Sequence, residues 1–291
     1  MTRTSCEHTR DTLRPMHELR LRLLTTAFAL SMLNACGDDG NSDDAVAMET
    51  EGDGDGDGDG DGDGDGDGDG DGDGDGDNMV SVSGDAFAFT LPGQEYGRID
   101  GATISVLEDP SITTISEADG HFALELPEGA TATFVLDADG FPPARTKTFT
   151  VPDTGLERVT FQIPDDALVD TLAALLMIEL DPAACQLVST VTRVGKSIYD
   201  AGAHGEEGAI VTIDPPLPAE HGPIYFNSQV IPDPSLTETS DDGGVLFTNV
   251  PPGVYTLRAS KDGVVFEDAI MQCEAGVLVN ASPPYGLQAL P

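Results

Sequence analysis

The segments Gly101-Ala-Thr-Ile-Ser-Val106 and Gly208-Ala-Ile-Val-Thr-Ile213 decide the fold, because they are two copies of one strand signal. In each copy a Gly precedes a short run rich in β-branched residues, which favours a β-strand that begins after a turn. A further turn glycine stands nine residues after Gly120 in the first copy and nine residues after Gly244 in the second. This shared spacing indicates duplication of one hairpin unit.

Short alternating runs of apolar and polar residues surround the first copy. They lie at residues 80–82, 86–89, 102–106, 121–126, 132–136 and 146–151, and Gly, Pro or Asp bounds each run. Such runs predict short antiparallel strands joined by tight turns. We therefore expect a first β-module over residues 79–164 and, where the pattern returns, a second over residues 183–291.

Between these two modules the two-residue period breaks. The apolar positions there include Leu168, Leu172, Leu175 and Leu176. Their spacing of four, seven and eight residues from Leu168 puts all four on one face of a helix. Pro164 and Asp165 favour a helix start, and Pro182 favours a stop. We predict a helical connector over residues 165–182 whose apolar stripe packs on a sheet edge or between the modules.

The order of these signals resembles the carboxypeptidase regulatory-like domain, a small transthyretin-type β-sandwich. Each copy has a Gly-Ala strand, an Asp-Gly turn, a second strand and a turn with Pro and Gly, and the resemblance covers most of residues 97–151 and 206–270. It implies an all-β fold with two Greek-key or transthyretin-like β-sandwich modules. It also implies modules without catalytic residues of their own, which serve as accessory, ligand-presenting or carbohydrate-binding-like units on exported proteins.

The second copy departs from this pattern by an insertion at residues 214–236, a Pro-rich segment that contains Tyr225 and Phe226. Because loops vary for function while strands are held for packing, we expect a ligand-binding surface here. Strand alternation predicts one of the two rings in the core and the other toward solvent, where it would touch a ligand. The alternative is that both rings only cap the end of the sandwich.

The tetrapeptide Leu33-Asn-Ala-Cys36 resembles the lipobox of bacterial lipoproteins. It ends an apolar run at residues 21–33 that follows several arginines, and this run is too short to span a bilayer. The resemblance implies a signal peptide at residues 1–35 and a diacylglycerol on Cys36. We expect translation to start at Met16, because the residues before it are polar and partly acidic. The alternative for the apolar run is a short buried helix.

Residues 36–78 form the expected link between this anchor and the modules. A Gly-Asp dipeptide repeats without interruption over residues 52–77. It has no apolar side chain to bury and its carboxylates repel one another, so we predict a disordered acidic tether. It does not match a calcium loop, since the closing Glu of an EF-hand and the nine-residue period of an RTX repeat are both missing.

The cysteines predict one disulfide. The chain has four. Cys6 falls in the expected leader and Cys36 would carry lipid, so Cys185 and Cys273 remain for the exported part and most simply pair with each other. The alternatives are two free thiols or two metal ligands.

The sequence contains none of the common catalytic motifs, which favours a protein that is not an enzyme and has no cofactor or metal. A metal-dependent alternative comes from His204, His221, Tyr199 and Tyr225, since intradiol dioxygenases, also β-sandwich proteins, hold ferric iron with two His and two Tyr. These four residues have no tight spacing that would fix such a site. His121 begins a strand and is expected on the surface.

The net charge of −40, from 53 acidic and 13 basic residues, makes nucleic acid and anionic lipid headgroups poor partners. Membrane contact is therefore expected through the N-terminal lipid. Gly37, by resemblance to other lipoproteins, favours the outer membrane, on its periplasmic or its outer side. Together these features predict a lipid-anchored envelope protein that displays two non-catalytic modules for a glycan, an envelope protein or a structural role. An accessory subunit of an envelope complex is the other alternative.

Overall fold

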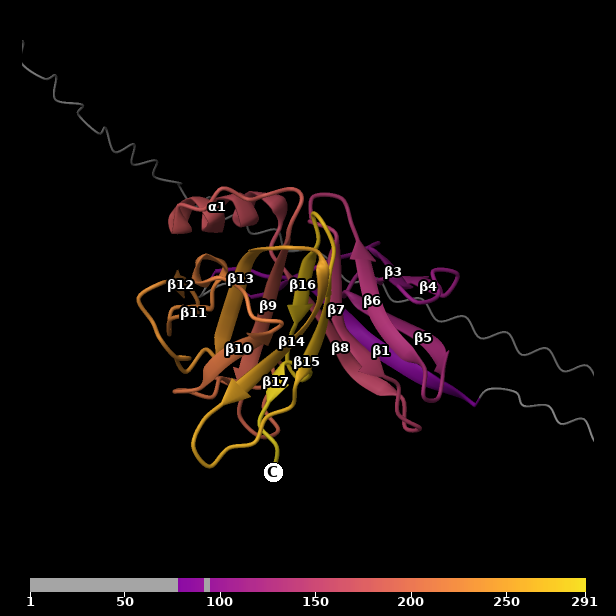
Figure 1. Cartoon of the computed structure of the whole chain (residues 1–291). Coiled ribbons are helices and arrows are strands. Elements are labelled where there is room, and N and C mark those ends of the chain that lie inside the picture. The colour runs from indigo at the N-terminus through magenta and orange to yellow at the C-terminus, as the bar shows by residue number, and fades with distance from the viewer. Residues whose placement is uncertain (1–77, 92–94) are drawn as a thin grey trace, which may run out of the picture. The chain divides into compact units, whose positions relative to one another are not determined.

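The computed structural model of the 291-residue chain describes residues 78–91 and 95–291 (Figure 1). The expected signal peptide at 1–35, its start at Met16, the lipid on Cys36 and the tether at 36–78, apart from Asn78, lie outside these residues. The described part is mostly β-structure in several sheets with one short α-helix, as the alternating pattern predicts. Within it, no helix is both long and apolar enough to cross a membrane.

The first half of the described chain contains eight strands. They are β1 (Met79–Ala88), β2 (Gly97–Arg98), β3 (Thr103–Val106), β4 (Thr113–Ile115), β5 (His121–Pro127), β6 (Thr131–Asp137), β7 (Ala144–Thr150) and β8 (Leu156–Ile163). One sheet has the order β2-β1-β5, with β8 parallel to β1 on its other side. The strands β7, β6, β3 and β4 follow one another in a second sheet.

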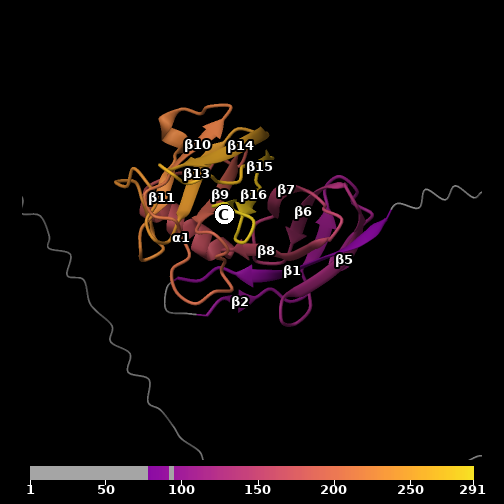
Figure 2. The same cartoon turned by 90° about the horizontal axis from the view of Figure 1, so that it is seen from below.

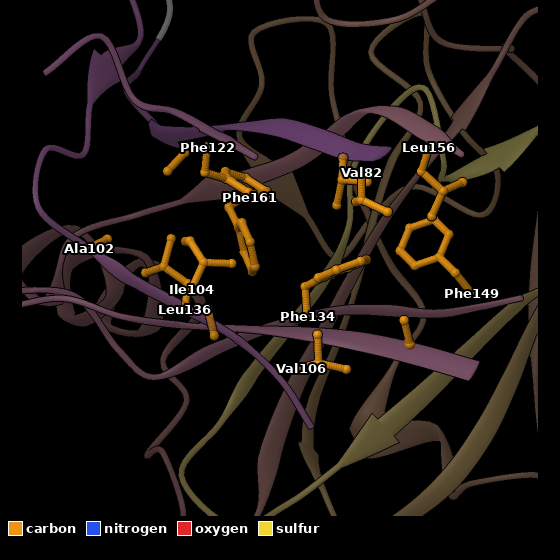
Figure 3. Packing of buried hydrophobic residues seen from close by; sticks show 14 of the residues in the cluster. Val82, Ala102, Ile104, Val106, Phe122, Phe134, Leu136, Phe149, Leu156 and Phe161 are labelled. Carbon is orange, nitrogen blue, oxygen red and sulfur yellow. The ribbon is translucent and has the colours of Figure 1, made fainter. Parts of the chain in front are cut away.

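A hydrophobic core fills the space between these two sheets (Figure 3). Val82 from β1 and Phe161 from β8 meet Ile104 from β3 and Phe134 from β6, and all four are fully buried. Within the first sheet, β1 and β8 come so close at Gly84, where their register shifts, that a Cβ atom there would lie 1.9 Å from the carbonyl oxygen of Val159. Glycine is therefore required at this point, since any side chain would force β1 and β8 apart.

The helix α1 (Asp166–Leu176) follows β8. The side chain of Asp165 caps it by accepting a hydrogen bond of 2.7 Å from the backbone N–H of Leu168. It ends at Met177, whose backbone adopts the left-handed conformation with φ of 55°. The helix is thus shorter than the predicted connector at 165–182, because this left-handed residue closes its last turn before Pro182 is reached.

The second half contains nine strands and one short 3-10 helix. They are β9 (Cys185–Thr192), β10 (Ile210–Asp214), η1 (Ala219–His221), β11 (Ile224–Phe226), β12 (Pro232–Asp233), β13 (Gly244–Val250), β14 (Gly253–Ser260), β15 (Ala269–Cys273), β16 (Leu278–Ala281) and β17 (Leu287–Gln288). The strands β10, β14 and β15 form one sheet, while β12, β11, β13 and β9 belong to another. A second hydrophobic core includes buried side chains from β9, β13 and β14.

The strand β16 joins the two halves. It pairs in parallel with β7, where Leu278 faces Ala144, and in parallel with β9, where Leu278 faces Gln186. A ten-stranded sheet therefore continues from β12 through β16 to β4, and β16 lies between β9 and β7 in Figure 1. Leu278 packs in the first core and Val279 in the second.

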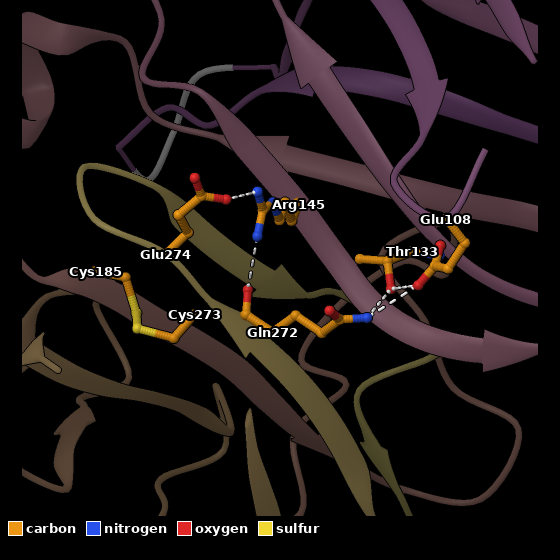
Figure 4. A network of polar contacts seen from close by, with 7 residues as sticks. All are labelled: Glu108, Thr133, Arg145, Cys185, Gln272, Cys273 and Glu274. Atoms are coloured by element: carbon orange, nitrogen blue, oxygen red, sulfur yellow. Dashed lines mark hydrogen bonds and ion pairs between the residues drawn. A yellow bond between two sulfur atoms is a disulfide. The ribbon is translucent and has the colours of Figure 1, made fainter. Parts of the chain in front are cut away.

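Polar contacts reinforce this joint (Figure 4). The side-chain amide of Gln272 on β15 donates to Glu108 at 2.9 Å and to the hydroxyl of Thr133 at 3.0 Å. Arg145 on β7 donates to the main-chain carbonyl of Gln272 at 3.4 Å and pairs with the carboxylate of Glu274. The halves are thus held together by main-chain hydrogen bonds, packing and side-chain contacts at once.

Candidate ligand-binding site

A cavity of about 130 Å³ lies between α1, the outer face of the second half's sheet, and the ends of β1 and β8. The helix lies close to β11 and β13 in both Figure 1 and Figure 2. From α1 the cavity is lined by Val169, Leu172, Ala173 and Leu176. Cavities of about 150 Å³ in other proteins hold a benzene-sized molecule, so this one has room for a small organic ligand.

The strands β9 and β13 direct residues into the cavity because side chains alternate across a sheet. On β9, Leu187 is buried in the second core while its neighbour Val188 lines the cavity. On β13, Phe247 is buried in the core while Leu246 lines the cavity. Both faces of these strands therefore carry apolar residues, one for the core and one for the space under the helix.

The apolar stripe of α1 meets this outer face without closing on it. None of the residues of α1 is fully buried. Leu172 lines the cavity, whereas Leu175 is 56% exposed. The predicted packing of the stripe on a sheet is thus only partly realised, because the cavity lies between the helix and the strands.

Among the described residues that line the cavity, Asp242 is the one with a carboxylate. It stands in the turn before β13, and its Oδ2 accepts a hydrogen bond of 3.0 Å from the backbone N–H of Gly244. The pKa of Asp242 is raised to about 6, chiefly by burial; the hydrogen bond from the Gly244 N–H opposes this rise, and the neighbouring carboxylate of Asp241 adds to it. Asp242 is therefore a carboxylate that is expensive to ionise but still mostly ionised at neutral pH.

His204 and Tyr96 are the other titratable groups of the lining. Burial lowers the pKa of His204, and the charge of Arg193 lowers it further. Burial also raises the pKa of Tyr96, with a contribution from Asp242. Both side chains are neutral at pH 7, so Asp242 carries the charge of the cavity.

Tyr225 and Phe226, the two aromatic residues predicted to form a ligand-binding surface in the insertion at 214–236, have different surroundings in the structure. Tyr225 is 1% exposed and belongs to the second core, where its hydroxyl accepts a hydrogen bond of 2.9 Å from the N–H of Val211. Phe226 is 8% exposed and lines the cavity. The prediction of a solvent-facing ring is wrong, because the insertion supplies β11, which pairs with β13 and is covered on both faces.

The predicted disulfide between Cys185 and Cys273 is present, with an S–S distance of 2.00 Å (Figure 4). It links β9 in one sheet to β15 in the other. The two cysteines are 88 residues apart in the sequence. Closing a loop of that length stabilises the fold by roughly 4 kcal/mol in the chain-entropy account.

The four residues of the metal-dependent alternative have separate surroundings. Tyr225 bonds in the second core, and the hydroxyl of Tyr199 donates to Asp85 in the first half. Nδ1 of His221 lies 3.0 Å from the carbonyl oxygen of Thr248, while His204 lines the cavity. Across residues 78–91 and 95–291, no three His, Cys, Asp or Glu residues gather as metal ligands would.

His121, expected on the surface, is half-buried on β5, with Nδ1 3.5 Å from the carboxylate of Asp85. Lys147 on β7 is a second buried charge away from the cavity. Its Nζ lies 3.5 Å from the carboxylate of Glu267, and burial lowers its pKa. No room for a ligand is found beside Lys147, so we assign it to the joint between the halves.

Sequence reasoning missed the cavity and Asp242. The sequence does contain one signal for the cavity. Apolar residues occur on both faces of two strands, Cys185-Gln-Leu-Val188 and Gly244-Val-Leu-Phe247, which indicates that a second layer covers the sheet. Nothing in the sequence distinguishes Asp242 from its neighbour Asp241, since both stand in the same turn.

Comparison with known proteins finds no matching family model and no match among curated proteins. Solved structures with distant similarity include the TIE protein of Bacillus anthracis, with 15% identity over 72% of this chain and a TM-score of 0.23. This chain spans about a third of that protein, since 34% of it is covered. A minor pilin of Streptococcus agalactiae matches at 10% identity over 73% of this chain and 97% of the pilin, with a TM-score of 0.24. TM-scores of this size do not establish a shared fold.

Proposed function

We propose that the chain is a lipid-anchored protein of the bacterial cell envelope that binds a small ligand in the cavity beside α1. The observation that carries the binding function is the cavity itself, which is mostly apolar and also has polar side chains in its lining, among them Asp242 and His204. Such a combination is the usual form of a small-molecule site in proteins. The largely apolar lining favours a small apolar body over the glycan implied by the resemblance to carboxypeptidase regulatory-like domains.

The location in the envelope rests on three observations. The lipobox-like tetrapeptide at residues 33–36 supports a lipid on Cys36, and Gly37 supports the outer membrane as the destination. The acidic tether at 36–78 would hold the β-sandwich modules away from the lipid. The disulfide Cys185–Cys273 fits an oxidising compartment outside the cytosol.

The two halves would then act as one rigid carrier. The strand β16 and the contacts of Gln272 and Arg145 tie them together, so the helix and the sheet keep a fixed relation around the cavity. A preformed site orders little on binding, which favours affinity for a small ligand. A non-catalytic binding role follows from this arrangement.

Filling the cavity tests the binding function. Leu172→Trp adds bulk that points into the cavity, whereas Leu175→Trp adds the same bulk on the exposed side of the same helix. We expect benzyl alcohol to bind the wild-type chain and the Leu175→Trp variant with equal affinity, and to lose at least tenfold in affinity for Leu172→Trp. Isothermal titration calorimetry on the full-length chain measures all three.

Equal binding by both tryptophan variants would move the site away from α1. Absence of binding to the wild-type chain would remove the cavity as a ligand site. Thermal unfolding followed by circular dichroism shows that both variants are folded before binding is compared.

A further inference from the structure

The cavity holds a half-buried carboxylate, that of Asp242, which no cation among the described residues matches. Oδ2 of Asp242 accepts the N–H of Gly244, and Oδ1 accepts no hydrogen bond from the residues that the structure describes. No ion pair of the described chain involves Asp242, and no Lys or Arg lines the cavity. A buried charge of this kind is costly unless something of opposite sign pairs with it.

The groups around Asp242 do not supply that charge. Asp241 beside it is acidic, and its buried Oδ1 also lacks a hydrogen-bond partner within the described residues. Tyr96 and His204 face the same cavity, and burial keeps both of them neutral at pH 7. The one nearby cation with an electrostatic effect here, Arg193, acts on His204 and does not line the cavity. The cavity therefore has a negative potential.

Aromatic rings provide a second feature that suits a cation. Phe89, Tyr96 and Phe226 all line the cavity. The rings of Phe89 and Tyr96 are stacked with centres 6.5 Å apart. The faces of aromatic rings attract ammonium groups, and this attraction increases where water is excluded.

We propose that the cavity binds a small organic ammonium ligand. Its charged nitrogen pairs with Oδ1 of Asp242, next to the rings of Tyr96 and Phe226, and its apolar body lies between Leu172 and Leu246. This inference rests on the proposed function, because it names the ligand class of the same cavity. Under this proposal, the cavity distinguishes ligands by their charge as well as by their size.

The test compares benzylamine with benzyl alcohol, which have nearly the same shape and differ in charge. At pH 7.5 we expect the full-length chain to bind benzylamine at least tenfold more tightly than benzyl alcohol. Asp242→Asn keeps the shape and an acceptor for the Gly244 N–H but removes the charge, so it should bind both probes equally. Asp153→Asn, at an exposed position outside the cavity, should keep the wild-type preference.

The wild-type chain alone gives an independent readout. With the pKa of Asp242 at about 6, its ionised fraction falls roughly tenfold between pH 7.5 and pH 5. Benzylamine stays protonated over this range, so its affinity should fall by the same factor, while that of benzyl alcohol should not change.

Equal affinities of the wild-type chain for the two probes would overturn the ammonium proposal and leave the cavity as a site for neutral apolar ligands. An amine preference that persists in Asp242→Asn, or that does not depend on pH, would also overturn it. Failure of both probes to bind would instead count against the proposed function itself, so the two failures are distinguishable.

Discussion

At the residue scale, the ionised form of Asp242 lowers the stability of the fold. Its pKa is raised from 3.8 to about 6, so the folded chain holds a proton more tightly than the unfolded chain does. Such a group contributes stability below about pH 4, and this contribution is lost as the pH rises through 6. A carboxylate kept at that cost in a mostly apolar cavity is a candidate functional group.

Asp242→Asn should therefore make the chain more stable at neutral pH. We expect the free energy of unfolding to rise by about 1–3 kcal/mol at pH 7, and to change little at pH 4 where wild-type Asp242 is mostly protonated. Urea denaturation at the two pH values measures the difference, with Asp153→Asn as the matched control at an exposed position. A variant less stable than wild type at pH 7 would show that the charged carboxylate is needed to hold the turn before β13.

At the element scale, the insertion at 214–236 behaves as part of the sheet. The strand β11 pairs with β12 on one side and β13 on the other, and Tyr225 sits in the second core. An insertion that contributes a buried strand and a core aromatic cannot be treated as a free loop. Two of its residues, Phe226 and Val230, line the candidate site.

Replacing residues 219–233 by a short Gly-Ser linker should abolish cooperative folding of the second half. Loss of one buried aromatic side chain typically costs 3–5 kcal/mol, which is comparable to much of a domain's total stability of roughly 5–15 kcal/mol. Thermal unfolding followed by circular dichroism measures the effect. Removing the same length from the Gly-Asp repeat at 52–77 is the control and should leave the melting temperature unchanged. A cooperative transition at the wild-type temperature in the first variant would show that the insertion is dispensable.

At the scale of the whole molecule, the expected anchor and the described β-structure make separate contributions. Under the proposed function, the anchor would set where the protein is, and the joined halves would set what it binds. The strand β16 is central to the second role, because it pairs with β7 and β9 and contributes side chains to both cores.

The anchor predicts that cells supplied with a clickable fatty acid will label the protein at Cys36. Cys36→Ser should abolish the label and leave uncleaved precursor, detected as a larger band on immunoblots. Cys6→Ser provides a matched control and should be labelled like wild type. Equal labelling of Cys36→Ser would contradict the lipoprotein assignment.

Sequence alone determined the features that depend on local spacing. Alternation with turn residues predicted the mostly β structure, and Asp165 with the leucine spacing predicted the start of α1. The disulfide followed from counting the cysteines that remain once Cys6 and Cys36 are assigned to the expected leader and lipid anchor. These inferences hold because a hydrophobic period and a helix cap each involve only neighbouring residues, and the number of cysteines can be read directly from the sequence.

Only the tertiary structure decided the features that depend on which distant residues meet. The strand β16 pairs with both β7 and β9, and the sequence of residues 278–281 gives no sign of this, because main-chain pairing across long separations leaves no local pattern. The cavity arises from α1, β9 and β13 together, with Asp242 at the end of one of them. Burial is the main cause of the raised pKa of Asp242. Because burial depends on all the residues packed around a side chain, the sequence next to Asp242 did not indicate the raised pKa.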